Sequence, residues 1–246
     1  MNSNFIALIP KKDNVLDIKD FWPVDIGNTI PQVISKILTH RLGEIAKGMI
    51  SYNQFGFVPG RIIQNCLFTA LKCVNVMKKR VKHGNMALKI DISKDFDPII
   101  WSFIFTILIM HGFSHGLIDL IGSLMRSVRL SIMVNGSPWG FFKCSRGVRH
   151  GYPLFGLLFS IAEDYLNQCI NDLTNIGLYQ RMSVGRNHFA MSHLLYAYDI
   201  LLFGKANKST ILCIKSILSH YEEVSGQVIS WSKSSVMFVD GVINSR

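Results

Sequence analysis

The sequence predicts an α+β fold built around an antiparallel sheet. Apolar hairpins and amphipathic helices follow one another in mixed order, without the regular strand–helix–strand alternation that is typical of parallel sheets. The chain has 246 residues, 49% of them hydrophobic and 17% charged, so it can bury a substantial core and is not disordered. This length fits one large domain or two small ones.

Short apolar runs bounded by turn residues predict the strands. The runs 129–134 and 139–143 are joined by Asn-Gly-Ser-Pro, which is a strong hairpin signal. A second hairpin is expected around residues 196–199, where two apolar runs flank a short polar tip. Further strands are expected at 5–10, 86–91 and 235–238, with another β segment near Met182.

Apolar residues at helical spacing predict the helices. The first covers residues 31–46, where Pro31 suits the opening turn. The other expected helices cover residues 62–81, 99–111, 115–126, 154–175 and 207–224. The longest apolar stretch, 99–110, is interrupted by Ser102 and Thr106 and is much shorter than the roughly 20 residues of a membrane span. We therefore expect no membrane contact.

The charge balance favours a polyanionic partner. There are 26 Lys and Arg residues against 16 Asp and Glu, a formal net charge of +10, which favours nucleic acid. The alternative is a fragment whose acidic partner domains are absent. The 5 cysteines show neither a CxxC pair nor the spacing of a zinc site, so we expect reduced thiols in an intracellular protein. Nucleus and cytoplasm stay open as alternatives.

Two carboxylates stand at the ends of predicted strands. Asp91 ends the strand 86–91, and Asp199 lies at the tip of the second hairpin. Nucleotidyl transfer needs such a pair, because acids from separate strands clamp two Mg²⁺ ions about 3.5–4 Å apart. Aspartates after strands are also common on ordinary surfaces, so the pair alone is a weak signal.

The sequence segments around these aspartates resemble the motifs of LINE-type (non-LTR) retrotransposon reverse transcriptases, especially those of plants. The hairpin tip, Tyr-Ala-Tyr-Asp, is similar to their aromatic-Ala-Asp-Asp signature, with Tyr198 in place of the first aspartate. The other similar segments are the first catalytic motif (89–101), the template-gripping motif (145–154), the segment 57–61 ahead of a finger–palm helix, and the finger motifs (5–12 and 20–28). The resemblance is colinear and covers almost the whole chain.

The resemblance implies a right-hand polymerase fold with fingers and palm, an antiparallel palm sheet packed on helices, and a missing thumb. It implies one partial reverse transcriptase domain over residues 1–246, with 1–85 mostly fingers and 86–246 mostly palm. The implied activity is RNA-directed DNA polymerisation, with an RNA template, a DNA primer, dNTPs and Mg²⁺ or Mn²⁺. The remainder of the retroelement polyprotein is expected to be absent.

The resemblance also implies roles for single residues. Asp91 and Asp199 would be catalytic and would bind metal, helped by the backbone carbonyl of Ile92. Phe96 matches the aromatic residue that stands under the sugar and rejects a 2′-hydroxyl. The positions expected to contact nucleotide or template are Phe96, Arg61, Lys94, Arg149, Gly151 and Lys233.

Departures from the family pattern predict an inactive enzyme. Tyr198 replaces a metal-binding aspartate with a phenol that is neutral at pH 7. Trp22 stands where an arginine is usual, and Tyr152 where an aspartate is usual. Pro98 stands where an arginine is usual, and it would cost about 3 kcal/mol if it lay inside a helix. The alternatives are a non-catalytic nucleic-acid-binding module and a non-functional element remnant.

Overall fold

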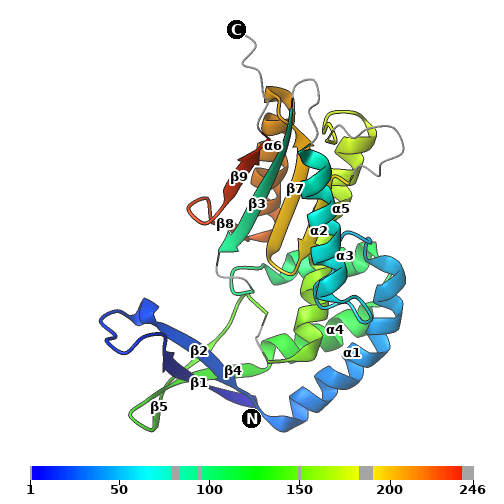
Figure 1. Ribbon diagram of the computed structural model, residues 1–246. Coiled ribbons are helices and arrows are strands. Elements are labelled where there is room, and N and C mark those ends of the chain that lie inside the picture. The colour runs from blue at the N-terminus through cyan, green and yellow to red at the C-terminus, as the bar shows by residue number, and fades with distance from the viewer. Residues whose placement is uncertain (1, 79–83, 94–95, 149–150, 183–190, 240–246) are drawn as a thin grey trace.

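The computed structural model describes residues 2–78, 84–93, 96–148, 151–182 and 191–239 (Figure 1). Its described part contains two separate sheets and a set of helices that packs beside and behind them. This arrangement confirms the predicted α+β fold.

The first sheet has the strand order β2-β1-β4-β5. Its strands are β1 (Asn2–Pro10), β2 (Phe21–Ile26), β4 (Val128–Val134) and β5 (Ser137–Lys143). The predicted hairpin of β4 and β5 is confirmed, whereas the sequence did not predict that β1 pairs in parallel with β4. Strand β2 was also missed. It contains Pro23, which the sheet tolerates because β2 lies at the edge.

The second sheet has the order β6-β7-β3-β8, and β9 also pairs with β3. Its strands are β3 (Asn85–Ser93), β6 (His193–Tyr196), β7 (Asp199–Lys205), β8 (Val228–Ile229) and β9 (Ser235–Phe238). All of these pairings are antiparallel, so the predicted antiparallel sheet on helices is confirmed. No strand forms at Met182 itself, and residues 183–190 lie outside the described part.

The helices begin and end close to where the sequence predicts. They are α1 (Thr29–Met49), α2 (Ile63–Met77), α3 (Trp101–Met110), α4 (His115–Arg126), α5 (Pro153–Asn175) and α6 (Lys208–Ser225), with a short 3₁₀ helix at Ile18–Asp20. The Asn207 side chain caps α6 by accepting from the Thr210 N–H at 2.8 Å, and Gly226 ends it with φ 73°. Pro98 lies in the turn ahead of α3, so the cost of a helix-interior proline does not apply.

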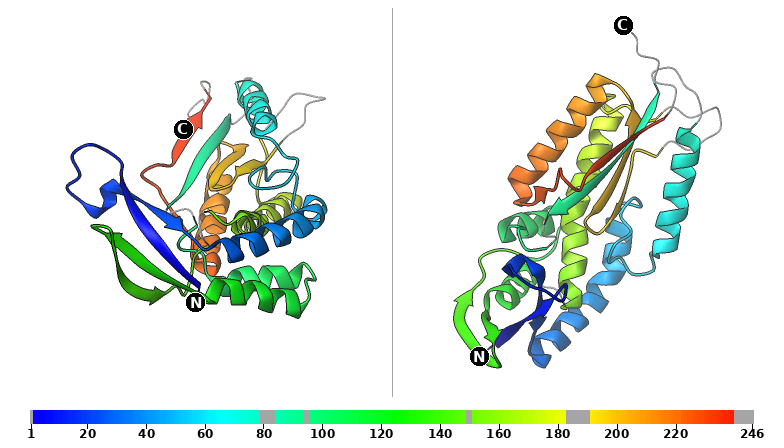
Figure 2. Two further views of the ribbon diagram at one scale, coloured as in Figure 1. Left: turned by 90° about the horizontal axis from the view of Figure 1, so that it is seen from below. Right: turned by 60° about the vertical axis from the view of Figure 1, so that its left-hand side comes forward.

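Helix α5 forms the centre of the core. It packs against α1, α3 and α6, and it runs from the level of the first sheet to the back of the second (Figure 2). Most of its length is buried, and Leu154, Leu157, Leu158, Phe159 and Leu166 are fully so. Burial of these side chains contributes roughly 1.5–3 kcal/mol each. None of the helices in the described ranges is long and apolar enough to cross a bilayer.

The side chain of Arg61 holds the segment that follows α1. Its guanidinium donates to the carbonyl oxygens of Ser51 and Gln54, both at 2.5 Å, and to that of Ile50 at 2.7 Å. These three carbonyls belong to the segment that follows α1, which ends at Met49, and the planar arginine fork can satisfy several acceptors at once. In the structure the guanidinium of Arg61 donates to main-chain carbonyls. The phosphate contact expected for Arg61 stays a prediction.

Replacing Arg61 with lysine is expected to lower the free energy of unfolding by about 1.5–3 kcal/mol, because a lysine lacks the fork that holds several carbonyls. Urea denaturation measures this change. Arg41→Lys, at an exposed position of α1, serves as the matched control and should stay within about 0.5 kcal/mol of wild type. An equally small change for Arg61→Lys would contradict this stabilising role of Arg61.

A carboxyl group is buried between α5 and α6. Glu163 is 0% exposed, and its Oε1 accepts a hydrogen bond from the hydroxyl of Tyr221, which is 1% exposed. Its Oε2 has no hydrogen-bond partner in the described part of the chain. Burial, which disfavours the charged form, raises the pKa of Glu163 from its ordinary 4.5 to about 8. The group is therefore protonated in the folded chain at neutral pH.

This raised pKa predicts a loss of stability with rising pH. The folded chain holds the Glu163 proton up to about pH 8, whereas the unfolded chain loses it near pH 4.5. The stabilisation is complete below the unfolded pKa and is lost as the pH rises through the folded one. Glu163→Gln should flatten the decline of the melting temperature between about pH 5 and pH 9. Glu223→Gln, at an exposed position of α6, should leave the wild-type slope unchanged.

Candidate functional site

The hairpin of β6 and β7 turns through the two residues Ala197 and Tyr198, and Tyr196 pairs with Asp199. Ala197 has φ 53°, a positive value that is typical of the first central residue of a type II′ turn. Glycine is preferred there, and a side chain at such a φ costs of order 1–3 kcal/mol. The surrounding structure must therefore hold this turn in place.

The segment 53–56 holds the hairpin from the side opposite β7. Leu195 exchanges two backbone hydrogen bonds with this segment, each 2.8 Å long. Gly56 packs on the turn so closely that a Cβ would lie 2.3 Å from the backbone nitrogen of Ala197. The hydroxyl of Ser160 in α5 donates to the carbonyl of Gly56 at 2.7 Å. The strained turn is thus fixed between β7 and a segment that is tied to the central helix.

The structure brings together the two predicted carboxylates. Asp91 on β3 and Asp199 on β7 are direct cross-strand partners, so both side chains lie on one face of the sheet. Each carboxylate has a lysine nearby. The Nζ of Lys89 lies 3.3 Å from the Oδ1 of Asp199, and the Nζ of Lys233 lies 4.0 Å from the Oδ1 of Asp91. The sequence singled out Lys233 but missed Lys89.

The loop that carries Lys233 is anchored on the backbone of Asp91. The N–H of Ser230 donates to the Asp91 carbonyl at 2.8 Å, and the Oγ of Ser234 accepts from the Asp91 N–H at 3.2 Å. These bonds explain why Lys233 lies beside the carboxylate pair although it is far away in the sequence. Ile92, the next residue of β3, is only 1% exposed.

Aromatic rings surround the tip of the hairpin. Phe96 is buried, and the ring of Tyr198 packs against it edge to face, with 6.5 Å between the ring centroids. Phe159 lies 4.6 Å and Phe57 5.7 Å from the same ring. Phe57 has φ 53°, and its ring lies over Gly156, where a Cβ would come within 2.7 Å of it. Sequence reasoning missed the role of Phe57, although its place after Gly56 marks an unusual turn.

The glycine-containing loop lies against the turn that follows β3. The N–H of Gly147 donates to the carbonyl of Ile99 at 2.8 Å, which places the two segments side by side. Gly151 has φ 95°, and no atom lies within 4 Å of the place where a Cβ would stand. This leaves room for a ligand to approach the backbone closely. Two predicted contact residues, Lys94 and Arg149, lie outside the described residues.

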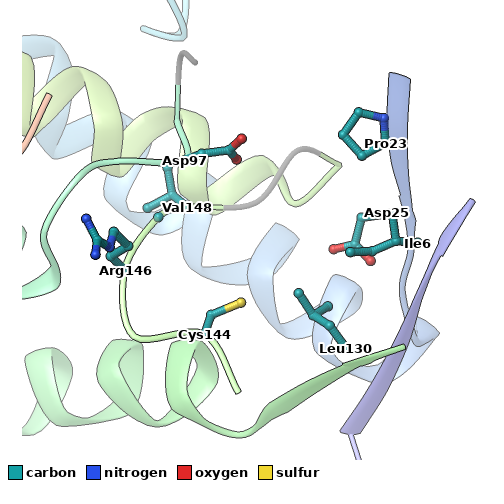
Figure 3. Close-up of a pocket in the computed structure, with 9 residues that line it drawn as sticks. Ile6, Pro23, Asp25, Asp97, Leu130, Cys144, Arg146 and Val148 are labelled. Carbon is teal, nitrogen blue, oxygen red and sulfur yellow. The ribbon is translucent and has the colours of Figure 1, made fainter. Parts of the chain in front are cut away.

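A separate pocket of about 250 Å³ lies between the first sheet and this loop (Figure 3). Its apolar lining includes Ile6 and Leu130 from the sheet, and the carboxylates of Asp25 and Asp97 lie on different walls. Arg146 lines the same pocket. Neither Asp91 nor Asp199 belongs to this lining, so the pocket is distinct from the carboxylate pair.

The donor set at the hairpin does not fit a pair of metal ions. In the described part of the chain, no three or more His, Cys, Asp or Glu side chains are grouped to hold a metal ion. Asp91 and Asp199 can supply oxygen ligands for one Mg²⁺ together with substrate phosphates. A second ion needs further oxygen ligands, and Tyr198 offers only a neutral phenol at the turn.

Comparison with known proteins shows the family. The family model described as reverse transcriptase (RNA-dependent DNA polymerase) matches residues 9–242. A 149 kDa protein of transposon TX1 from Xenopus laevis is 27% identical over 94% of this chain and 17% of its own length. The Pol polyprotein of the type-2 retrotransposable element R2DM from Drosophila melanogaster is 27% identical over 65% of this chain and 15% of its own. The chain thus spans only a small part of these relatives.

Solved structures show the same fold. An apo telomerase from Candida tropicalis that lacks its C-terminal domain superposes with a TM-score of 0.67 over 99% of this chain and 51% of that one. The sequence identity is 12%, so this likeness concerns the fold alone. The family match, the relatives and the fold agree: the chain belongs to the reverse transcriptase family, as a domain of the non-LTR retrotransposon type.

Proposed function

We propose that this chain is the fingers-and-palm part of a LINE-like reverse transcriptase that does not catalyse nucleotidyl transfer as it stands. The observation that carries this proposal is Tyr198, which lies at the hairpin turn beside the cross-strand pair of Asp91 and Asp199. The family has a carboxylate at this position, as the resemblance of the hairpin motif implies. The placement among plant elements is a further part of the proposal and rests on the motifs alone.

The proposed division assigns residues 1–85 mostly to the fingers and 86–246 mostly to the palm. The separation of the two sheets supports it, since β1 and β2 belong to the first sheet and β3 to the second. Strands β4 and β5 return to the first sheet, so the later part of the chain also contributes to the fingers.

The proposed ligands are those of the ancestral reaction: an RNA template, a DNA primer, dNTPs and Mg²⁺ or Mn²⁺. Asp91, Asp199 and the carbonyl of Ile92 would hold a single cation. Phe96 would lie under the sugar. Gly151, with its open backbone, would contact the template pair. The other proposed contacts with nucleotide or template are Lys94, Arg149, Arg61 and Lys233.

The physical reason for inactivity is the loss of one charged oxygen ligand. A cation at this turn would lose both a ligand and a negative charge, and with them the activation of the nucleophile and the stabilisation of the leaving group. The phenol ring of Tyr198 also packs on Phe96, and it fills space that a carboxylate would leave open. Each ~1.36 kcal/mol of lost transition-state stabilisation lowers the rate about tenfold.

Primer extension on an RNA template tests the proposal. With a DNA primer and Mg²⁺ or Mn²⁺, the wild-type chain should incorporate no more dNTP than an Asp91→Ala control. Tyr198→Asp restores the carboxylate and should raise incorporation by at least about tenfold, if about 1.36 kcal/mol or more of stabilisation returns. Incorporation by wild type above the Asp91→Ala control would contradict the proposal.

The second candidate function is a non-catalytic nucleic-acid-binding module, which the net charge of +10 favours. Binding to a single-stranded RNA oligonucleotide should then weaken steeply with salt, with a slope of about −0.7 in log K against log salt for each phosphate neutralised. Lys233→Gln, which removes one such contact, should reduce the size of that slope by about 0.7. Fluorescence anisotropy at several salt concentrations measures both effects, and an affinity that does not change with salt would rule this function out.

A cooperative thermal transition of the purified chain would count against a non-functional remnant.

A further inference from the structure

We propose that Tyr198 and Phe57 form a stacking surface for an unpaired base of single-stranded nucleic acid, and that this contact needs no divalent cation. The inference rests on the proposed function in one respect, since it assumes that the chain binds nucleic acid. It assigns a use to the tyrosine that stands where the family has a carboxylate.

The two rings are held by one buried ring between them. Phe96 contacts Phe57 at 5.7 Å and Tyr198 at 6.5 Å between centroids, with interplanar angles of 62° and 86°. Phe159 of α5 supports Phe96 from the core at 4.6 Å. Edge-to-face pairs of this kind contribute about 0.5–1.5 kcal/mol each beyond the area they bury. The four rings therefore form a connected cluster that is rooted in the central helix.

The backbone that carries the two outer rings is held in an unusual conformation. Phe57 itself and Ala197, which precedes Tyr198, each have φ 53°. Bulky residues rarely adopt positive φ, and such strain persists where the surrounding structure enforces it, often at ligand sites. Gly56 and Gly156 supply the close contacts that enforce it here. A preorganised surface loses little conformational entropy when a ligand binds.

Both outer rings keep solvent-accessible surface. Phe57 is 51% exposed, while Phe96 behind it is 7% exposed. Tyr198 is partly exposed and packs against the core by its other side. Phe57 therefore keeps surface that a ligand can contact.

The charges beside the rings suit a phosphate backbone without a metal ion. Asp91 and Asp199 would repel phosphates, but Lys89 and Lys233 lie 3.3 and 4.0 Å from carboxylate oxygens and bring the formal charge of the four side chains to zero. Both lysines are well exposed, with 54% and 70% of their side-chain surfaces accessible. They can therefore turn toward a phosphate that follows a base stacked on Tyr198.

A base of any identity has a π face, so such a surface binds single strands with little sequence preference. Stacking of a base on an aromatic side chain is worth about 1–3 kcal/mol by substitution. The ligand class that this geometry fits is thus an unpaired nucleobase of RNA or DNA. A tyrosine that merely fills space would contribute nothing to this affinity.

The test measures the binding of fluorescein-labelled oligo(U) and oligo(dT) of about 12 nucleotides in EDTA, by anisotropy. Tyr198→Leu keeps an apolar side chain against Phe96 but has no ring, and it should weaken binding by about 5- to 100-fold. Tyr198→Phe should bind within about twofold of wild type, because the ring remains. Tyr52→Leu removes an exposed tyrosine outside the ring cluster and is the matched control, expected to match wild type.

A second readout does not depend on how well Tyr198→Leu folds. Tyr198→Trp keeps the stacking surface, and its added fluorescence should be quenched when the oligonucleotide binds. Equal affinity of Tyr198→Leu and wild type, or a wild-type affinity that needs Mg²⁺, would overturn the stacking proposal alone. Absence of any binding by wild type would overturn nucleic-acid binding as well. Catalysis stays a separate question, since these mixtures contain no dNTP.

Discussion

The pairing of β3 with β7 is the constraint on which the candidate site depends. On β3, Leu88, Ile90 and Ile92 face the core, while Lys89 and Asp91 lie on the opposite face. A slip of one residue would turn an aspartate into the core and expose an isoleucine, and a buried charge without a partner is costly. Burial of the apolar face thus fixes the register, and the register sets Asp91 opposite Asp199. The geometry of the polar face is a consequence of the core beneath it.

A tyrosine at this turn is compatible with the fold, although it does not supply the charged ligand that nucleotidyl transfer needs. Two carboxylates lie beside two lysines here, and a third carboxylate at this turn would leave the group with a net negative charge. The ring of Tyr198 also gains a contact with Phe96. At this turn the proposed cation site therefore has a neutral phenol and not a charged oxygen ligand. A chain can keep its family fold under such a substitution.

Sequence reasoning predicted what is local and missed what is not. The helices, the two hairpins and the antiparallel second sheet follow from spacing and turn residues, and the structure confirms them. The parallel pairing of β1 with β4 joins segments that are far apart in the chain, and no local pattern encodes it. Strand β8 has only two residues, too few for a periodic signal. The positive φ of Phe57 is set by packing against Gly156 and could not be read from its residue type.

The same limit applies to the candidate site, where the residues predicted from the motifs divide between two tasks. Asp91, Asp199 and Lys233 converge because sheet register and a loop anchored on the Asp91 backbone bring them together. Arg61, from a motif that looked equally functional, donates to the carbonyls of the segment that follows α1. Arg61 therefore stabilises the segment that leads to Gly56, and Gly56 in turn supports the strained turn at Ala197. A residue can thus serve the site by holding the backbone that shapes it, and its residue type alone does not distinguish this role from contact with a ligand.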